Sequence, residues 1–202
     1  MTMSTKSPID SMNEYKGGAF PSPIIPVLGF SFGLAAPYGI VHGGLVTVSL
    51  TENSPSIDSL VSVLQSFGYI GMLFLSEFLL GAAARSISAK ASFSPAAAAA
   101  TGRNSFAIVQ ANRIHQNHIE SVCIFAPSVL AAAAACGGSS TGQDKVIWLK
   151  AAVLSWVGFR VLYRAGFCYS PNPFWRLVGT AASMTQSILC IYHWGQLSFT
   201  SS

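Results

Sequence analysis

The sequence predicts an all-α integral membrane protein, a bundle of about four or five membrane-spanning helices. Its 202 residues are 51% hydrophobic and only 9% charged, with a mean hydropathy of +0.50. Soluble domains carry roughly a quarter charged residues, so this chain cannot build a polar surface. The charges are also clustered, and the apolar runs between them reach the length of about 20 residues that a bilayer core of about 30 Å requires of a helix.

The chain opens with a polar stretch that is followed by an apolar segment. Residues 1–22 lack the pattern of a cleavable signal peptide, so we expect a disordered tail. The segment 24–50 contains no charged residue and is interrupted by Pro26 and Pro37, which membrane helices tolerate better than soluble ones. We expect residues 23–58 to form an additional N-terminal transmembrane helix and a turn, with a re-entrant or surface-lying segment as the alternative.

Four further apolar segments form the main membrane unit, residues 59–202. The first of them contains one charge, Glu77, and ends at Arg85, and the second begins with a polar stretch, 110–120. Alanine, glycine and serine recur throughout, as expected where membrane helices approach closely. The segments cover residues 60–84, 105–135, 146–167 and 177–197.

The basic residues predict the orientation of five spans. If every segment crosses the membrane, one side holds only Lys145 and Lys150, beside three acidic residues. The positive-inside rule places the opposite, more basic side in the cytoplasm. That cytoplasmic side carries Lys6, Lys16, Arg85, Lys90, Arg103, Arg164 and Arg176.

The stretch 112–120 is the most informative about function. Arg113, Asn117 and Glu120 are spaced by four and then three residues, which places their side chains on one face of a helix. A charge near the bilayer centre costs about 2.5–3.5 kcal/mol on insertion scales. We therefore expect these side chains to face the bundle interior or a water-filled cleft. A structural polar network that locks helices together is the alternative.

Three more arginines are expected at the same membrane face. Arg85 ends its segment, Arg160 lies near the cytoplasmic end of its own, and Arg176 follows the next connection. Only Glu77 and Glu120 are available to balance the arginines gathered there. Guanidinium groups favour carboxylates, phosphates or a thiolate, so the excess predicts an anionic ligand. Interfacial anchoring is the alternative for Arg160 and Arg176.

The pattern Arg113-x-x-x-Asn117-x-x-Glu120 resembles the signature of the MAPEG superfamily, the membrane-associated proteins of eicosanoid and glutathione metabolism. The stretch 159–167, an arginine followed by aromatic positions, is similar to the third-helix motif of that family. Arg176 stands where the microsomal prostaglandin E synthase group carries its catalytic arginine. The resemblance covers about residues 60–197 and implies a four-helix membrane bundle, which the additional helix precedes.

By this resemblance the protein is expected to be a homotrimer that binds glutathione between subunits and acts on a lipophilic substrate from the lipid bilayer. A guanidinium beside the thiol makes it available as a nucleophile, and Arg176 or Arg85 is the implied catalytic residue. The implied location is the endoplasmic reticulum or another intracellular membrane. The residues expected to hold glutathione are Arg113, Asn117, Glu120, Arg160 and Tyr163.

Two departures from the family pattern favour an alternative function. Phe167 stands where well-studied family enzymes have tyrosine, and Ser121 stands where some members have tyrosine. A non-catalytic membrane scaffold, or an accessory subunit of a larger membrane complex, is therefore the alternative to a glutathione transferase or peroxidase. A small transporter is disfavoured because the sequence contains no broken-helix repeat.

Other partners are not expected. The net charge of +4 is too small and too scattered for nucleic acid. His115 and His118 could suggest a metal, but four histidines in all cannot supply a histidine-rich di-iron site, so no metal is expected. Glu77 is expected to pair with a donor on a neighbouring helix, with a proton carrier as the alternative. The four cysteines are expected to be buried, reduced thiols.

Overall fold

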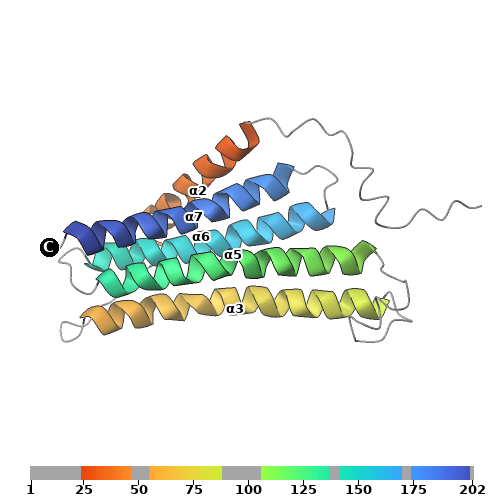
Figure 1. The fold of residues 1–202 in the computed structure, drawn as a ribbon, viewed down its shortest axis with the longest axis horizontal. Helices are drawn as coiled ribbons and strands as arrows, with labels where there is room; N and C mark the ends of the chain where they lie inside the picture. Colours follow the sequence, from red (N-terminus) through yellow and green to blue (C-terminus); the bar gives the residue numbers. More distant parts are fainter. Residues whose placement is uncertain (1–23, 47–54, 88–105, 137–141, 170–173, 201–202) are drawn as a thin grey trace, which may run out of the picture.

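The computed structural model describes residues 24–46, 55–87, 106–136, 142–169 and 174–200, and α-helices dominate them. The predicted tail, residues 1–22, lies outside the described residues. In Figure 1, successive helices run in opposite directions; four lie alongside one another, and α2 is inclined to them. The helices are α2 Ile24–His42, α3 Pro55–Ile87, α5 Phe106–Cys136, α6 Gly142–Tyr169 and α7 Phe174–Thr200.

Three of the described helices are long and apolar enough to cross a membrane. They are α3 over Ser59–Ala83, α5 over Ala111–Cys136 and α6 over Asp144–Gly166. The additional helix α2 contributes a shorter apolar stretch, Val27–His42. The protein is therefore an all-α membrane protein, as the composition predicts.

Helices α3, α6 and α7 extend beyond the apolar segments from which they were predicted, whereas α2 ends at His42, short of the expected residue 50. α3 begins at Pro55, inside the stretch expected to be a turn. A proline suits the first helical position because its missing N–H would have no intrahelical partner there. α6 likewise ends at Tyr169 and α7 begins at Phe174, which shortens the expected connection. Hydropathy marks only the part of a helix in hydrocarbon, whereas backbone hydrogen bonding continues past it.

The core lies between α3, α5 and α6, with contributions from α7. At its centre the ring of Phe125 stacks on Trp156, with ring centroids 5.0 Å apart and planes 4° from parallel. Buried alanines such as Ala133 and Ala152 allow the helices around these rings to approach closely. Large apolar side chains on the outer surface, such as Met72 at 68% exposed, are expected of a surface that faces lipid.

The cysteine prediction is confirmed at two of the three positions described. Cys136 and Cys190 are free and buried, and they behave as small apolar residues. Cys123 is free but exposed on the single chain, because it lies on a face of α5 that the chain's other helices leave uncovered. Cys168 lies outside the residues whose side chains are described.

Helix α2 packs against α7 through two glycines. A Cβ atom added at Gly29 would lie 2.6 Å from the Cβ of Ala181, and one added at Gly33 would lie 2.6 Å from the Cβ of Thr185. The side-chain amide of Gln186 donates to the carbonyl oxygen of Gly33 at 2.6 Å. The contacts advance by four residues on both helices, so α2 and α7 run parallel in close contact.

Candidate functional site

One end of the bundle collects the predicted site residues. The end of α3, the start of α5, the end of α6 and the start of α7 meet there, on the right in Figure 1. They meet because helices of similar length that alternate in direction return the chain to the same face. Arg85 lies in the last turn of α3, but its side chain is outside the described residues.

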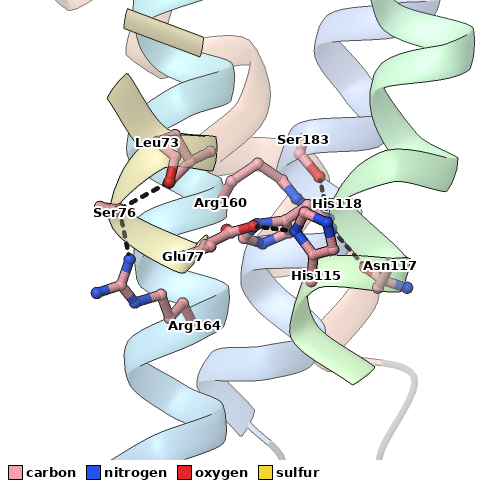
Figure 2. Close-up of polar contacts among 9 residues, drawn as sticks. All are labelled: Leu73, Ser76, Glu77, His115, Asn117, His118, Arg160, Arg164 and Ser183. Carbon is pink, nitrogen blue, oxygen red and sulfur yellow. Dashed lines mark hydrogen bonds and ion pairs between the residues drawn. The ribbon is translucent and has the colours of Figure 1, made fainter. Parts of the chain in front are cut away.

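Arg160 of α6 is the centre of a polar network that joins three helices (Figure 2). It is only 1% exposed. Its guanidinium donates to Oδ1 of Asn117 on α5 and, at 3.3 Å, to Oγ of Ser183 on α7. It also lies over the rings of Tyr163 and Trp156, 4.7 and 5.8 Å from their centroids, within the range of cation–π contacts. This one side chain therefore fixes α5, α6 and α7 relative to one another.

Tyr163 lies three residues after Arg160 on α6, and several charged side chains of the site lie near it. Its side chain is buried and packs against the imidazole of His118, with ring centroids 5.5 Å apart. Three guanidinium groups and one carboxylate lie within electrostatic reach of Tyr163, so the charge described around it is net positive. These groups belong to Arg160, Arg176, Glu120 and Arg113.

Arg113, Asn117 and Glu120 share one face of α5, as their spacing predicts, but they differ in burial. Asn117 is half-buried and reaches Arg160, whereas Arg113 and Glu120 are exposed on the single chain. Oε1 of Glu120 accepts a hydrogen bond from Nε2 of Gln116 at 2.9 Å. Only Asn117 faces the bundle interior as expected, and part of the predicted site lies on the surface of one chain.

Two glycines bring Arg176 toward Tyr163. A Cβ atom added at Gly166 would lie 2.7 Å from the Cβ of Trp175, and one added at Gly179 would lie 2.8 Å from the backbone nitrogen of Tyr163. Only glycine permits helices α6 and α7 to approach so closely. As a result, Arg176 in the first turn of α7 is half-buried beside the site.

A buried carboxylate also reaches this end of the bundle from α3. Oε1 of Glu77 contacts Nδ1 of His118, and Oε2 lies 3.3 Å from Nδ1 of His115 (Figure 2). The prediction that Glu77 pairs with a donor on a neighbouring helix is confirmed. Across the described helices, no group of three His, Cys, Asp or Glu side chains has an arrangement that could hold a metal ion.

Sequence reasoning missed two polar contacts of this network. Arg164 donates to Oγ of Ser76 at 2.8 Å, and Ser183 accepts from Arg160. The spacing in the sequence indicates the direction of Arg164, because it lies four residues after Arg160 and therefore on the same side of the helix. It does not identify Ser76 as the partner. Ser183 stands in a run of small residues, where a serine that packs and one that accepts a hydrogen bond look the same.

The geometry divides the arginines into two groups. Arg160 is held inside the bundle by Asn117 and Ser183, whereas Arg113 is exposed and Arg176 is half-buried. An exposed or half-buried guanidinium can still present its fork of donors to a carboxylate or a phosphate. The arrangement therefore suits an anionic ligand that lies along α5 and the start of α7.

The sequence was compared with models of protein families. The model of the MAPEG family matches residues 62–194. The matched segment begins early in α3 and ends near the end of α7, so it contains every predicted site residue and leaves α2 outside. Comparisons with curated proteins and with solved structures gave no match.

Proposed function

The chain belongs to the MAPEG family, and we propose that it is a glutathione-dependent membrane enzyme, a transferase or peroxidase that acts on a lipophilic electrophile. One observation carries the proposal: the three arginines gathered around Tyr163 outnumber the two carboxylates there, Glu120 and Glu77. Excess positive charge in a medium of low dielectric constant favours an anionic ligand. Glutathione offers two carboxylates and an ionisable thiol.

Each group of the proposed site has a role that suits its chemistry. Arginine forks and the Asn117 amide match the carboxylates of the tripeptide, and the carboxylate of Glu120 matches its ammonium group. The ligand supplies a thiolate as nucleophile, and Arg176 or Arg85 would stabilise that charge. Five residues would form the site for the tripeptide: Arg113, Asn117 and Glu120 would contact it directly, and the buried Arg160 and Tyr163 would support it from behind.

The surface position of two of the five binding residues supports association between copies of the chain, for which we propose a homotrimer. Arg113 and Glu120 are exposed on the single chain, and exposed charges bind weakly because water screens them. A neighbouring copy that covers this face of α5 would remove them from water and complete the site. The lipophilic substrate would then enter from the bilayer, along apolar surfaces such as the outer face of α3.

Glutathione binding by the purified protein, measured by calorimetry in detergent, tests the proposal. The wild type should bind, and Arg113→Ala and Arg176→Ala should each weaken binding about tenfold or more, which is about 1.4 kcal/mol. Lys145→Ala removes a positive charge from the opposite end of α6 and is the matched control, so its affinity should stay unchanged. A wild type that does not bind glutathione would refute the function.

A non-catalytic scaffold or accessory subunit is the second candidate, and one observation favours it. Phe167 and Ser121 stand where family enzymes carry tyrosines, so the phenolic hydroxyl that could donate to a thiolate is missing at both positions: Phe167 has no hydroxyl, and Ser121 has only a short one close to its backbone. Turnover of a chlorodinitrobenzene-type electrophile and of a lipid hydroperoxide separates the two candidates. Glutathione binding without turnover of either substrate would establish the scaffold.

A further inference from the structure

The pair formed by Glu77 and His118 lies behind the proposed glutathione site and has no role assigned in it. Glu77 is 6% exposed and His118 is fully buried. Both lie in segments that are long and apolar enough to cross a membrane. A carboxylate removed from water is costly unless a positive charge and hydrogen bonds compensate for it. The buried pair therefore requires a compensating cation nearby.

Arg160 is the buried cation that meets this requirement. Its hydrogen bonds go to neutral acceptors, Asn117 and Ser183. Within the described ranges, the only ion pairs at contact distance are those of Glu77 with its two histidines. Glu77 and Arg160 are linked through two packed rings, because Glu77 contacts His118, the ring of His118 packs on Tyr163, and Arg160 lies over Tyr163. Among the side chains whose burial the structure describes, no other carboxylate is buried. Glu77 and Arg160 are therefore the two buried groups whose opposite charges can offset each other.

His118 connects the carboxylate to the site. Its Nδ1 faces Oε1 of Glu77, so a hydrogen on this nitrogen donates to the carboxylate. Nε2 is buried and has no hydrogen-bond partner among the described residues, so the hydrogen bond that orients the ring is the one to Glu77. The ring packs on Tyr163, which also receives the guanidinium of Arg160 at 4.7 Å.

Glu77 also fixes the position of α5 relative to α3. Its two oxygens contact His115 and His118, which lie three residues apart on α5. Asn117 lies between these two histidines in the sequence and reaches Arg160. A carboxylate that holds both histidines therefore sets the rotation of α5 that presents Asn117 to the site.

We propose that Glu77 and His118 are positioning residues of the glutathione site. Glu77 balances the charge of Arg160 and, through His118, holds Asn117 and Tyr163 in the arrangement that binds the tripeptide. The proposal rests on the proposed function. It adds two residues that do not touch the ligand but determine how well the binding residues are arranged.

Three variants measured by glutathione calorimetry test the positioning role. Glu77→Gln removes the charge and keeps the shape, and His118→Leu removes the donor, so each should raise the Kd about tenfold or more. His118→Asn keeps a donor close to the place of Nδ1 and should stay within about threefold of the wild type. Ser66→Ala is the control, because that buried hydroxyl on α3 donates only to Val63 of its own helix. Wild-type Kd values for both Glu77→Gln and His118→Leu would overturn the proposal.

A thermal unfolding cycle without ligand tests the charge balance separately. Glu77→Gln and Arg160→Gln should each lower the melting temperature, and the double variant should lose less than the sum of the two. Losses that simply add would overturn the charge pairing even if glutathione binds. If the wild type does not bind glutathione, the proposed function fails, and this cycle still decides whether Glu77 and Arg160 are coupled. If Glu77→Gln does not fold, the contrast between His118→Asn and His118→Leu decides the positioning role.

Discussion

Arg160 illustrates how a single guanidinium can be accommodated inside a membrane bundle. Its charge is spread over a plane that donates to Asn117 and Ser183 and lies over two aromatic rings. Arginine is less strongly hydrated than an ammonium group and donates in a fixed fork. These two properties, rather than charge alone, make arginine suitable at this position.

Replacement of Arg160 by lysine should therefore destabilise the protein. Arg160→Lys keeps the charge but cannot bridge Asn117 and Ser183 together, so we expect a loss of about 1.5–3 kcal/mol in the free energy of unfolding. Unfolding in detergent micelles, followed by circular dichroism, measures it. Arg164→Lys is the matched control, because Arg164 is half-buried and makes one hydrogen bond to Ser76. Equal losses in the two variants would contradict the argument.

The sequence predicts which site residues share a helix face but not how deeply each is buried. The spacing of Arg113, Asn117 and Glu120 defines one face of α5, and the structure shows that face. Burial of Asn117 depends on Arg160, which lies 43 positions away in the sequence. The spacing of residues within α5 cannot identify a partner on another helix. Glu77 was predictable as a paired acid, since an isolated carboxylate in a membrane helix is costly; the identity of its histidine partners was not.

Helix α2 shows how an element outside the family match can be part of the bundle. Its glycines contact α7 closely, and Gln186 hydrogen-bonds the backbone of Gly33. Within a membrane, helix association depends on such close packing and on interhelical hydrogen bonds. We therefore expect α2 to be an integral fifth helix rather than a separate anchor.

A bulky side chain at Gly33 should weaken the contact between α2 and α7. Gly33→Leu would bring a Cβ to within 2.6 Å of Thr185, and overpacking of this kind costs about 1–3 kcal/mol. Gly39→Leu on the same helix is the control, because a Cβ there would meet nothing within 4 Å. Thermal unfolding in detergent should show a lower midpoint for Gly33→Leu alone. Equal midpoints for the two variants would mean that α2 is not held by this contact.

The existence and order of the helices followed from the apolar segments, but the helix ends did not. Long apolar runs separated by charges, glycines and prolines are a strong signal. The start of α3 at Pro55 and the end of α6 at Tyr169 fall in polar or mixed sequence, where helix and connection have similar composition. The glycine contacts of α2 also escaped prediction, because a glycine at a helix contact and one that only loosens a helix look alike in a single sequence.

At the scale of the whole molecule, the two ends of the bundle differ in charge. The end that carries the proposed site contains Arg113, Arg160, Arg164 and Arg176, whereas the described basic residues at the other end are Lys145 and Lys150. The alternating helix directions place the start of α2 at the arginine-rich end and the end of α7 at the opposite end. This arrangement matches the orientation that the positive-inside rule assigns to five spans.

A topology measurement can test the arrangement that five membrane crossings predict. If they do, a reporter joined after Ser202 should lie on the non-cytoplasmic side, and one inserted in the basic connection 88–105 should lie in the cytoplasm. An odd number of crossings places the N-terminus and the C-terminus on opposite sides of the membrane. The basic residues of the connection 88–105 keep that connection in the cytoplasm. Both helices that fall outside the three clear spans, α2 and α7, would then have to cross. Cytoplasmic accessibility of both reporters would mean that one of the three helices between them, α5, α6 or α7, does not cross. Of these three, α7 lies outside the three clear spans, so it would be the first to reassign to the membrane surface.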